Sequence, residues 1–250
     1  MYLENVPDRL ADYYAAEYYG DPTAEEFAAA ARAHEGYKVE LLQRFAQAGR
    51  LLDIGPARGG FAYLARESGF DVTVAEPDPG CCAFIAKRLG IRTVNSGDVV
   101  GVLAREEAFD VITLWHVIEH LTDPFAALAA AAGALRPGGV LIVAAPNPQA
   151  LQLRVFGSRW THVDAPRHLA LIPLRVLEQR SGLRTLLRTT SDPGGIAWNA
   201  FGWRESLGNL TTVHVAGAAL RRAGSALAVL AAPIERHGLC GAAYTVVFGA

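Results

Sequence analysis

Cysteine is scarce in this chain. Three are present among 250 residues, and two of them are adjacent, at positions 81 and 82. Three thiols cannot form a disulfide framework, and this number is typical of reduced cysteines in a cytosol. From Met1 to Ala30 the chain is acidic, rich in tyrosine and without an apolar segment, so it does not resemble a signal peptide. We therefore expect a cytoplasmic protein.

An excess of charge of either sign is also missing. Lys and Arg together number 23 and Asp and Glu 25, which gives a formal net charge of −2. Because the chain has no excess of positive charge, we expect no nucleic-acid partner. A chain of 250 residues is long enough to bury a sizeable core in one large domain or two small ones.

A glycine-rich turn is the most informative feature that is present. An apolar strand pattern ends at Asp53, the chain turns through Gly55 and Gly59, and a helical pattern follows. Glycine lets the backbone approach a ligand closely, and a helix N-terminus is electropositive. The next strand pattern ends in Glu76, about twenty residues beyond, where nucleotide-binding α/β folds place a carboxylate for ribose hydroxyls. We therefore expect an adenosine-containing cofactor.

The spacing of this turn separates two classes of cofactor. A dinucleotide-binding turn reads G-x-G-x-x-G, whereas this chain has Ala57 where the second glycine would fall and Gly59 two positions later. Asp53 would repel a pyrophosphate and attract an ammonium group, directly or through water. The turn resembles the D-x-G-x-G-x-G motif of class I S-adenosylmethionine-dependent methyltransferases. Ala57 can replace the middle glycine if its φ angle stays negative.

Three later segments resemble the same family in its order and spacing. Residues 95–99 are similar to the end of its third strand, residues 109–121 to its fourth strand and exit loop, and residues 135–143 to its turn and fifth strand. The resemblance implies a Rossmann-like α/β fold, with a doubly wound, mostly parallel sheet and an antiparallel last strand. A nicotinamide-dependent oxidoreductase, or a catalytically dead cofactor-binding or interaction protein, is the alternative.

The resemblance also implies which residues bind S-adenosylmethionine. They are grouped by the part of the ligand they face: Asp53, Gly55, Ala57 and Gly59 for the amino acid end, Glu76 with Pro77 for the ribose, Asp98 with Val99 for the adenine, and Trp115 with His116 near the sulfonium.

A polar loop after the fifth strand is the expected acceptor pocket. It contains W-x-H-x-D-x-P-R-H-L at residues 160–169, and a similar stretch occurs in methyltransferases of the ubiquinone-biosynthesis type. A loop at the carboxyl end of a strand lies on the ligand side of such a sheet. Trp160 can stack on the acceptor, and Arg167, with Asp164 nearby, can anchor a carboxylate or phosphate.

Three histidines are candidates for the base that removes a proton from an acceptor hydroxyl, since histidine titrates near neutral pH. They are His162, His168 and His116. The sequence thus favours methylation of a small, specialised metabolite, at oxygen rather than at nitrogen or carbon.

Two histidine patterns raise the question of a metal. Residues 116–120 match the H-x-x-E-H of inverted zinc peptidases, but those enzymes carry the motif inside a helix, and here a strand leads directly into it. His162, Asp164 and His168 form a second set, next to two arginines that would disfavour a cation. We therefore expect no metal.

The chain divides into a predicted helical lid and a larger domain. Residues 1–48 are the lid, where Asp21 is the predicted N-cap of a helix and Tyr18 and Tyr19 are expected to contact the acceptor. Residues 49–250 are the methyltransferase domain.

Two insertions interrupt this domain, at about residues 146–170 and 192–240. In the second, residues 225–234 form an apolar run of ten, too short to span a bilayer, so we expect no transmembrane segment. Four roles stay open for this segment. It can cover an apolar substrate, contact a membrane surface, form a homodimer surface, or pack on the sheet.

Overall fold

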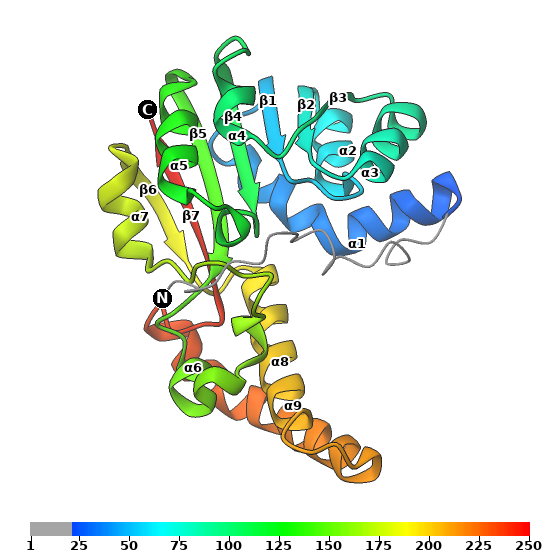
Figure 1. Ribbon diagram of the computed structural model, residues 1–250, viewed down its shortest axis with the longest axis vertical. Coiled ribbons are helices and arrows are strands. Elements are labelled where there is room, and N and C mark those ends of the chain that lie inside the picture. The colour runs from blue at the N-terminus through cyan, green and yellow to red at the C-terminus, as the bar shows by residue number, and fades with distance from the viewer. Residues whose placement is uncertain (1–21) are drawn as a thin grey trace.

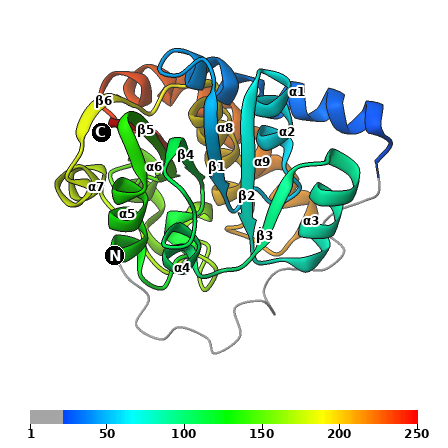
Figure 2. The same ribbon diagram turned by 90° about the horizontal axis from the view of Figure 1, so that it is seen from above.

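Helices cover both faces of a seven-stranded sheet in the computed structural model, which describes residues 22–250 (Figures 1 and 2). Tyr18 and Tyr19 lie outside the described residues. The strands are β1 Gly49–Ile54, β2 Phe70–Glu76, β3 Arg92–Asn95, β4 Phe109–Trp115, β5 Leu135–Pro146, β6 Arg184–Thr189 and β7 Ala243–Gly249. The helices are α1 Ala24–Gln43, α2 Gly60–Glu67, α3 Pro79–Phe84, η3 Ile85–Leu89, α4 Val99–Leu103, η4 Ile118–His120, α5 Pro124–Gly133, α6 Leu151–Phe156, η5 Gly157–Arg159, η6 Thr161–Val163, α7 Leu174–Ser181, α8 Pro193–Gly208 and α9 His214–His237.

The strand order is β3-β2-β1-β4-β5-β7-β6. The first five strands pair in parallel, and β7 runs antiparallel to both of its neighbours, β5 and β6. The last strand in the sequence is therefore an interior strand of the sheet. The expected mostly parallel sheet with an antiparallel last strand is confirmed.

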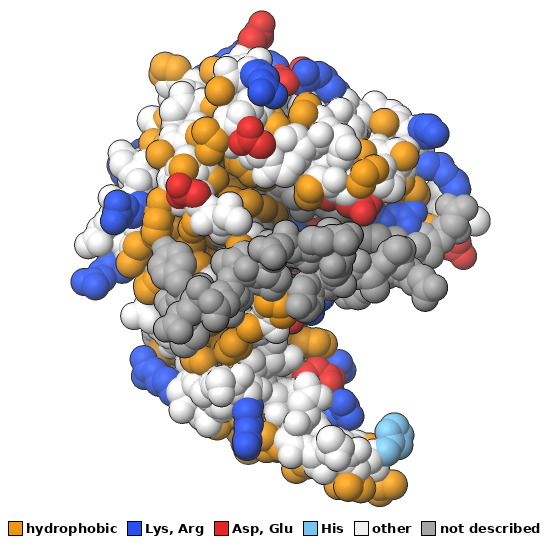
Figure 3. Space-filling model, viewed as in Figure 1, with side chains coloured by type: hydrophobic (Ala, Val, Ile, Leu, Met, Phe, Trp, Pro, Cys, Tyr) orange, Lys and Arg blue, Asp and Glu red, His pale blue; other side chains and the backbone are white. Residues whose placement is uncertain are grey.

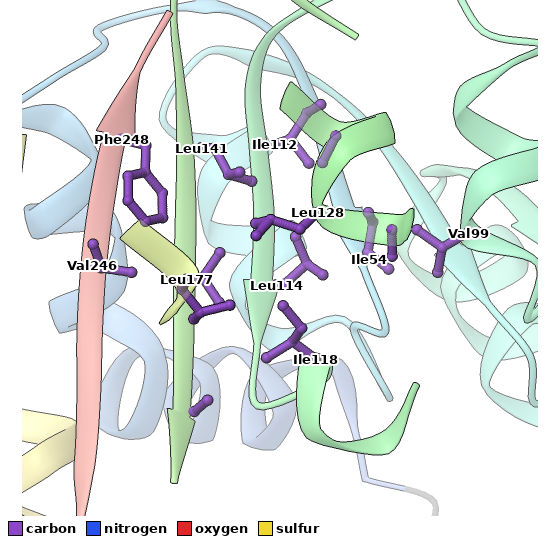
Figure 4. Packing of buried hydrophobic residues seen from close by; sticks show 14 of the residues in the cluster. Ile54, Val99, Ile112, Leu114, Ile118, Leu128, Leu141, Leu177, Val246 and Phe248 are labelled. Carbon is purple, nitrogen blue, oxygen red and sulfur yellow. The ribbon is translucent and has the colours of Figure 1, made fainter. Parts of the chain in front are cut away.

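The core forms two layers because successive strand residues point to opposite faces. Leu52, Ile112 and Leu141 belong to a cluster with α4, α5 and α7, whereas Leu51 and Ile142 belong to one with α1 and α2. Figure 4 shows the first layer, with strand side chains directed at the helix that covers them. Burying one leucine or isoleucine contributes about 1.5–3 kcal/mol, so both layers fix the strand ends that carry the site.

Helix α1 begins slightly later than the sequence suggested. Its N-cap is Thr23, whose hydroxyl accepts from the Glu26 backbone N–H while the Glu26 carboxylate accepts from the Thr23 N–H. This reciprocal capping box satisfies two backbone donors, so Asp21 as the N-cap is wrong. Leu41 and Leu42 of α1 are buried in the core. A lid role for residues 1–48 stays a prediction.

Helices α8 and α9 form a hairpin that extends away from the sheet (Figure 1). They touch closely at Gly224, where a Cβ would lie 2.5 Å from the carbonyl oxygen of Trp203. Helix α9 has 24 residues, so the apolar run of ten is part of a much longer helix. Among residues 22–250, α9 alone is long and apolar enough to cross a membrane by length and composition, and 17% of its apolar window is buried. Hydrophobic side chains gather at the tip of this hairpin (Figure 3).

Candidate active site

The glycine-rich turn lies at the carboxyl end of β1, next to the ends of β2 and β4. Gly55 has a φ of 66°, and a Cβ there would lie 2.6 Å from Cγ2 of Val117. Gly59 has a φ of 77° and is the N-cap of α2. Both positions therefore favour glycine. Helix α2 begins directly after the turn, so its N-terminal N–H groups lie beside it.

Ala57 adopts the left-handed backbone conformation, with a φ of 52°. The condition under which alanine replaces this glycine without strain, a negative φ, is therefore not met. This conformation costs a residue with a Cβ about 1–2 kcal/mol. The turn is held by Glu76, whose Oε2 accepts from the Ala57 backbone N–H at 3.0 Å and whose Oε1 accepts from the Asp78 N–H at 2.9 Å. Burial raises the pKa of Glu76, and these two hydrogen bonds oppose the rise.

The expected adenine residues begin the next helix along the edge. Asp98 is exposed and is the N-cap of α4, because its Oδ1 accepts from the Gly101 N–H at 2.8 Å, and Val99 is buried. Pro77, directly after Glu76, is exposed. The structure thus brings the ribose and adenine candidates to the same edge of the sheet as the turn, while their contacts with a cofactor stay predictions.

Asp53 lies inside the sheet. Its Oδ1 accepts from the Thr113 hydroxyl at 2.7 Å, and residue 113 is its register partner in β4. Burial raises the pKa of Asp53 to about 7, although Thr113 and Lys38 act in the opposite direction. A buried carboxylate that is reluctant to ionise is stabilised in its charged form by a cationic ligand, as the amino acid end of S-adenosylmethionine would provide.

The end of β4 carries Trp115 and His116. Trp115 is buried, with its ring 5.5 Å from that of Phe61 in an edge contact and Lys38 Nζ 5.0 Å from its centroid. His116 has a φ of 57°, an uncommon conformation for a residue other than glycine. Such strain is often found at functional sites, where the surrounding structure enforces it.

Trp198 of α8 is stacked between two of the candidate histidines. Its ring lies 4.0 Å from that of His116 at 9° and 4.4 Å from that of His162 at 18°. This stack joins the end of β4, the loop at residues 146–170 and the hairpin. Sequence reasoning missed Trp198 as a site residue, and its only signal was an aromatic side chain in an insertion.

The three histidines differ in environment. Burial lowers the pKa of His162 to about 4, and its Nε2 donates to the Trp198 carbonyl at 3.2 Å. Burial also lowers the pKa of His168, although Glu119 acts in the opposite direction. The side chain of His116 is the most open of the three, at 19% exposed. Which of them acts as a base stays a prediction.

The acceptor residues expected in the loop are not equally accessible. Trp160 is 1% exposed, belongs to a small buried cluster and donates from Nε1 to Gln152 Oε1 at 3.0 Å. The prediction that Trp160 stacks on an acceptor is therefore wrong, because its ring is buried in the core. Arg167 is ion-paired with Asp164 at 2.8 Å, so these two opposite charges already compensate each other.

Glu119 is the residue that sequence reasoning passed over. It lies in η4, is 1% exposed, and neither of its carboxylate oxygens has a hydrogen bond. His116 Nδ1 lies 3.6 Å from its Oε1. Its backbone carbonyl accepts from the N–H groups of Leu169 and Ala170, which holds the polar loop against η4. The signal was present in H-x-x-E-H at residues 116–120.

Comparisons with known proteins agree with this geometry. Residues 27–186 match the model of a family described as a methyltransferase domain. The chain belongs to this methyltransferase family. S-adenosylmethionine is therefore its cofactor, as expected, and the glycines of the turn, the buried Asp53 and the N-terminus of α2 fit that ligand.

The relatives of this methyltransferase include two O-methyltransferases of different kinds. The chain is 32% identical over 150 residues to a malonyl-(acyl-carrier protein) O-methyltransferase of Serratia marcescens, a match covering 58% of each protein. It is 29% identical over 175 residues to a ubiquinone biosynthesis O-methyltransferase of Cereibacter sphaeroides, covering 63% of the chain and 67% of the relative. The chain thus spans little more than half the length of the first relative and about two thirds of the second.

Solved structures share the fold. A SAM-dependent methyltransferase from Archaeoglobus fulgidus superposes with a TM-score of 0.56 at 17% identity, covering 88% of this chain and 94% of that one. The family model ends at residue 186, whereas the structural superposition covers 88% of the chain. The similarity in fold therefore continues beyond residue 186.

Proposed function

We propose that this methyltransferase transfers a methyl group from S-adenosylmethionine to a hydroxyl oxygen of a small-molecule acceptor in specialised metabolism. The observation that carries the proposal is His116, a partly open histidine at the end of β4, on the edge where the glycine-rich turn and Glu76 also lie. The names of both relatives, which are O-methyltransferases, support oxygen as the accepting atom.

The reaction asks three things of the protein. The acceptor oxygen attacks the methyl carbon in line, the carbon–sulfur bond breaks, and the hydroxyl proton leaves. The sulfonium supplies an already activated leaving group, so the protein must align the acceptor, exclude water and take the proton. His116 presents Nδ1 to the Glu119 carboxylate at 3.6 Å, which leaves Nε2 as the nitrogen that accepts the proton. A carboxylate beside one ring nitrogen orients an imidazole and stabilises its charged form.

The acceptor pocket includes the Trp198 stack. Its indole contacts His116 on one side and His162 on the other, so the hairpin helps to position the base. His162 and His168 are more deeply buried, and in this proposal they hold the loop instead of taking the proton.

A set of single variants tests the base. His116→Ala should lower kcat by about 10²–10⁴-fold and leave the dissociation constant of S-adenosylmethionine unchanged by calorimetry. His214→Ala, at the exposed start of α9, is the matched control. A screen of hydroxyl-bearing metabolites with methyl-labelled cofactor identifies the acceptor first. Full activity of His116→Ala would assign the base elsewhere. Thermal stabilisation by NAD and not by S-adenosylmethionine would favour the oxidoreductase alternative.

Helix α9 supports a second proposal, that this enzyme contacts a membrane surface or a second copy of itself. Its exposed apolar residues include Val215, Val229, Leu230 and Ile234. Leu230→Glu should abolish sedimentation with anionic vesicles if the surface is lipid, or convert a dimer to a monomer in analytical ultracentrifugation. A wild-type protein that is monomeric and does not bind vesicles would contradict both.

A further inference from the structure

The carboxylate of Glu119 is buried, and His116 Nδ1 lies 3.6 Å from its Oε1, too far for a hydrogen bond. Both of its oxygens are inaccessible and without a hydrogen bond. Moving a carboxylate out of water is costly unless it is paired with a cation, accepts hydrogen bonds or binds a metal. Two further side chains approach it, and they are His120 from the same turn and His168 from the polar loop.

Both imidazoles are held by their Nδ1 atoms. His120 Nδ1 lies 2.8 Å from the carbonyl oxygen of Arg167, and His168 Nδ1 lies 2.8 Å from that of His162. A carbonyl oxygen can only accept a hydrogen bond, so each Nδ1 carries the proton and each Nε2 has a lone pair when the ring is neutral. Histidines that bind metals are oriented in this way, with the second nitrogen donating to a backbone carbonyl.

The spacing of the three side chains suits one small cation. One ligand atom from each of Glu119, His120 and His168 lies within 4.8 Å of the others. A tetrahedral cation with nitrogen and oxygen ligands at about 2.0–2.2 Å places those atoms about 3.3–3.6 Å apart. The ligand atoms would therefore have to approach one another by at most about 1.2–1.5 Å to complete the coordination.

We propose that Glu119, His120 and His168 bind one divalent transition-metal cation, with Zn²⁺ as the best-fitting ion. Two imidazoles and one carboxylate favour zinc and its neighbours over Mg²⁺ or Ca²⁺, which prefer oxygen ligands. The ion would compensate the charge of Glu119 and tie η4 to the polar loop. The proposal concerns binding alone and does not depend on methyl transfer.

In the structure, neither the short η4 helix nor the neighbouring Arg167 excludes a metal. The motif does not need a long helix, because η4 provides Glu119 and His120 while the third ligand, His168, comes from a loop far along the sequence. Of the two arginines expected to repel a cation, Arg167 is ion-paired with Asp164, which compensates its charge.

Metal binding is measured on the full chain without a histidine tag. The protein is stripped with a chelator, reloaded with Zn²⁺ and dialysed, and the metal content is determined by mass spectrometry. We expect about one Zn²⁺ per chain, with a calorimetric dissociation constant that Glu119→Gln and His168→Ala each weaken by more than about 100-fold, above the 10–100-fold typical of outer-shell changes. His34→Ala, on the exposed face of α1, is the matched control and should bind normally.

A second measurement covers the case in which a variant fails to fold. X-ray absorption on wild-type protein loaded with one Zn²⁺ should show nitrogen and oxygen ligands at about 2.0–2.1 Å with imidazole scattering and no sulfur. A sulfur shell would move the ion to a cysteine and overturn the proposal. Absence of stoichiometric Zn²⁺ in the folded wild-type protein would also overturn it, and would assign the compensation of Glu119 to a protonated histidine.

Discussion

Replacing Asp53 by asparagine should make the protein more stable at high pH and weaken cofactor binding. The carboxylate is buried between strands and its pKa is raised to about 7 from an ordinary 3.8. Between these two values the folded state binds more protons than the unfolded state, so the free energy of unfolding falls as pH rises. Each pH unit in this window costs about 1.36 kcal/mol, and the loss is complete above pH 7.

The difference between two pH values isolates this effect. From pH 5.5 to pH 8, wild type should lose about 2 kcal/mol through Asp53, since about 1.5 units of the window lie in that interval. Asp53→Asn cannot ionise and keeps an oxygen that accepts from the Thr113 hydroxyl, so it should escape this loss. Urea unfolding of both proteins at both pH values gives the four free energies needed. Asp71→Asn, at an exposed position of β2, is the control. It should lose as much unfolding free energy as wild type between pH 5.5 and pH 8.

Cofactor affinity provides the other half of the prediction. Because an ionised Asp53 attracts a cationic ligand, calorimetry should show tighter binding of S-adenosylmethionine by wild type at pH 8 than at pH 5.5, and weaker, pH-insensitive binding by Asp53→Asn. If the stability difference between the two proteins is the same at both pH values, the carboxylate does not titrate near 7 and the reasoning fails.

Three further substitutions test the turn and the hairpin. Glu76→Ala should weaken binding of S-adenosylmethionine by about 1–3 kcal/mol in calorimetry, and an unchanged dissociation constant would refute its role. Ala57→Gly should leave the free energy of unfolding unchanged or raise it by up to about 1 kcal/mol, because relief of the positive φ offsets the greater freedom of glycine in the unfolded chain; a loss above about 1 kcal/mol would count against strain. Gly224→Ala should cost about 1–3 kcal/mol by thermal or urea unfolding, since its Cβ would meet the Trp203 carbonyl, whereas Gly133→Ala meets nothing within 4 Å and should be neutral.

Elements with a clear apolar period could be predicted closely from the sequence. The sequence pattern indicates a helix at about residues 173–180, a strand at about 183–190 and a last strand at 243–248. The structure has them at Leu174–Ser181, Arg184–Thr189 and Ala243–Gly249. Helix α9 could not be predicted this closely, because the apolar run at residues 225–234 is less than half of it, and Pro233 inside that run is unusual in a helix. Most of the stability of a helix comes from the packing of its apolar face, so its length is not set by one local run.

The site was predictable where it depends on strand ends and not where it depends on packing. The turn and Glu76 lie together because parallel strands end at one edge. The burial of Trp160 and the stacking of Trp198 arise from the contact of two insertions, and no local pattern encodes that contact. Glu119 lies beside His168, which is distant in the sequence. Their proximity depends on the tertiary fold and could not be predicted from the sequence.

The position of β7 has a consequence for how this chain is made on the ribosome. In the described sheet β6 pairs with β7 alone, and the whole of the α8 and α9 hairpin separates the two strands in the sequence. At about 5–20 residues per second, translation takes several seconds to cross that interval. During this time one edge of β5 and the whole of β6 have no partner, so a nascent chain exposes unpaired edges on two strands, and these invite pairing with other chains. The hairpin of α8 and α9 emerges during the same interval and is the part of the sequence that can fold while the sheet waits for its seventh strand.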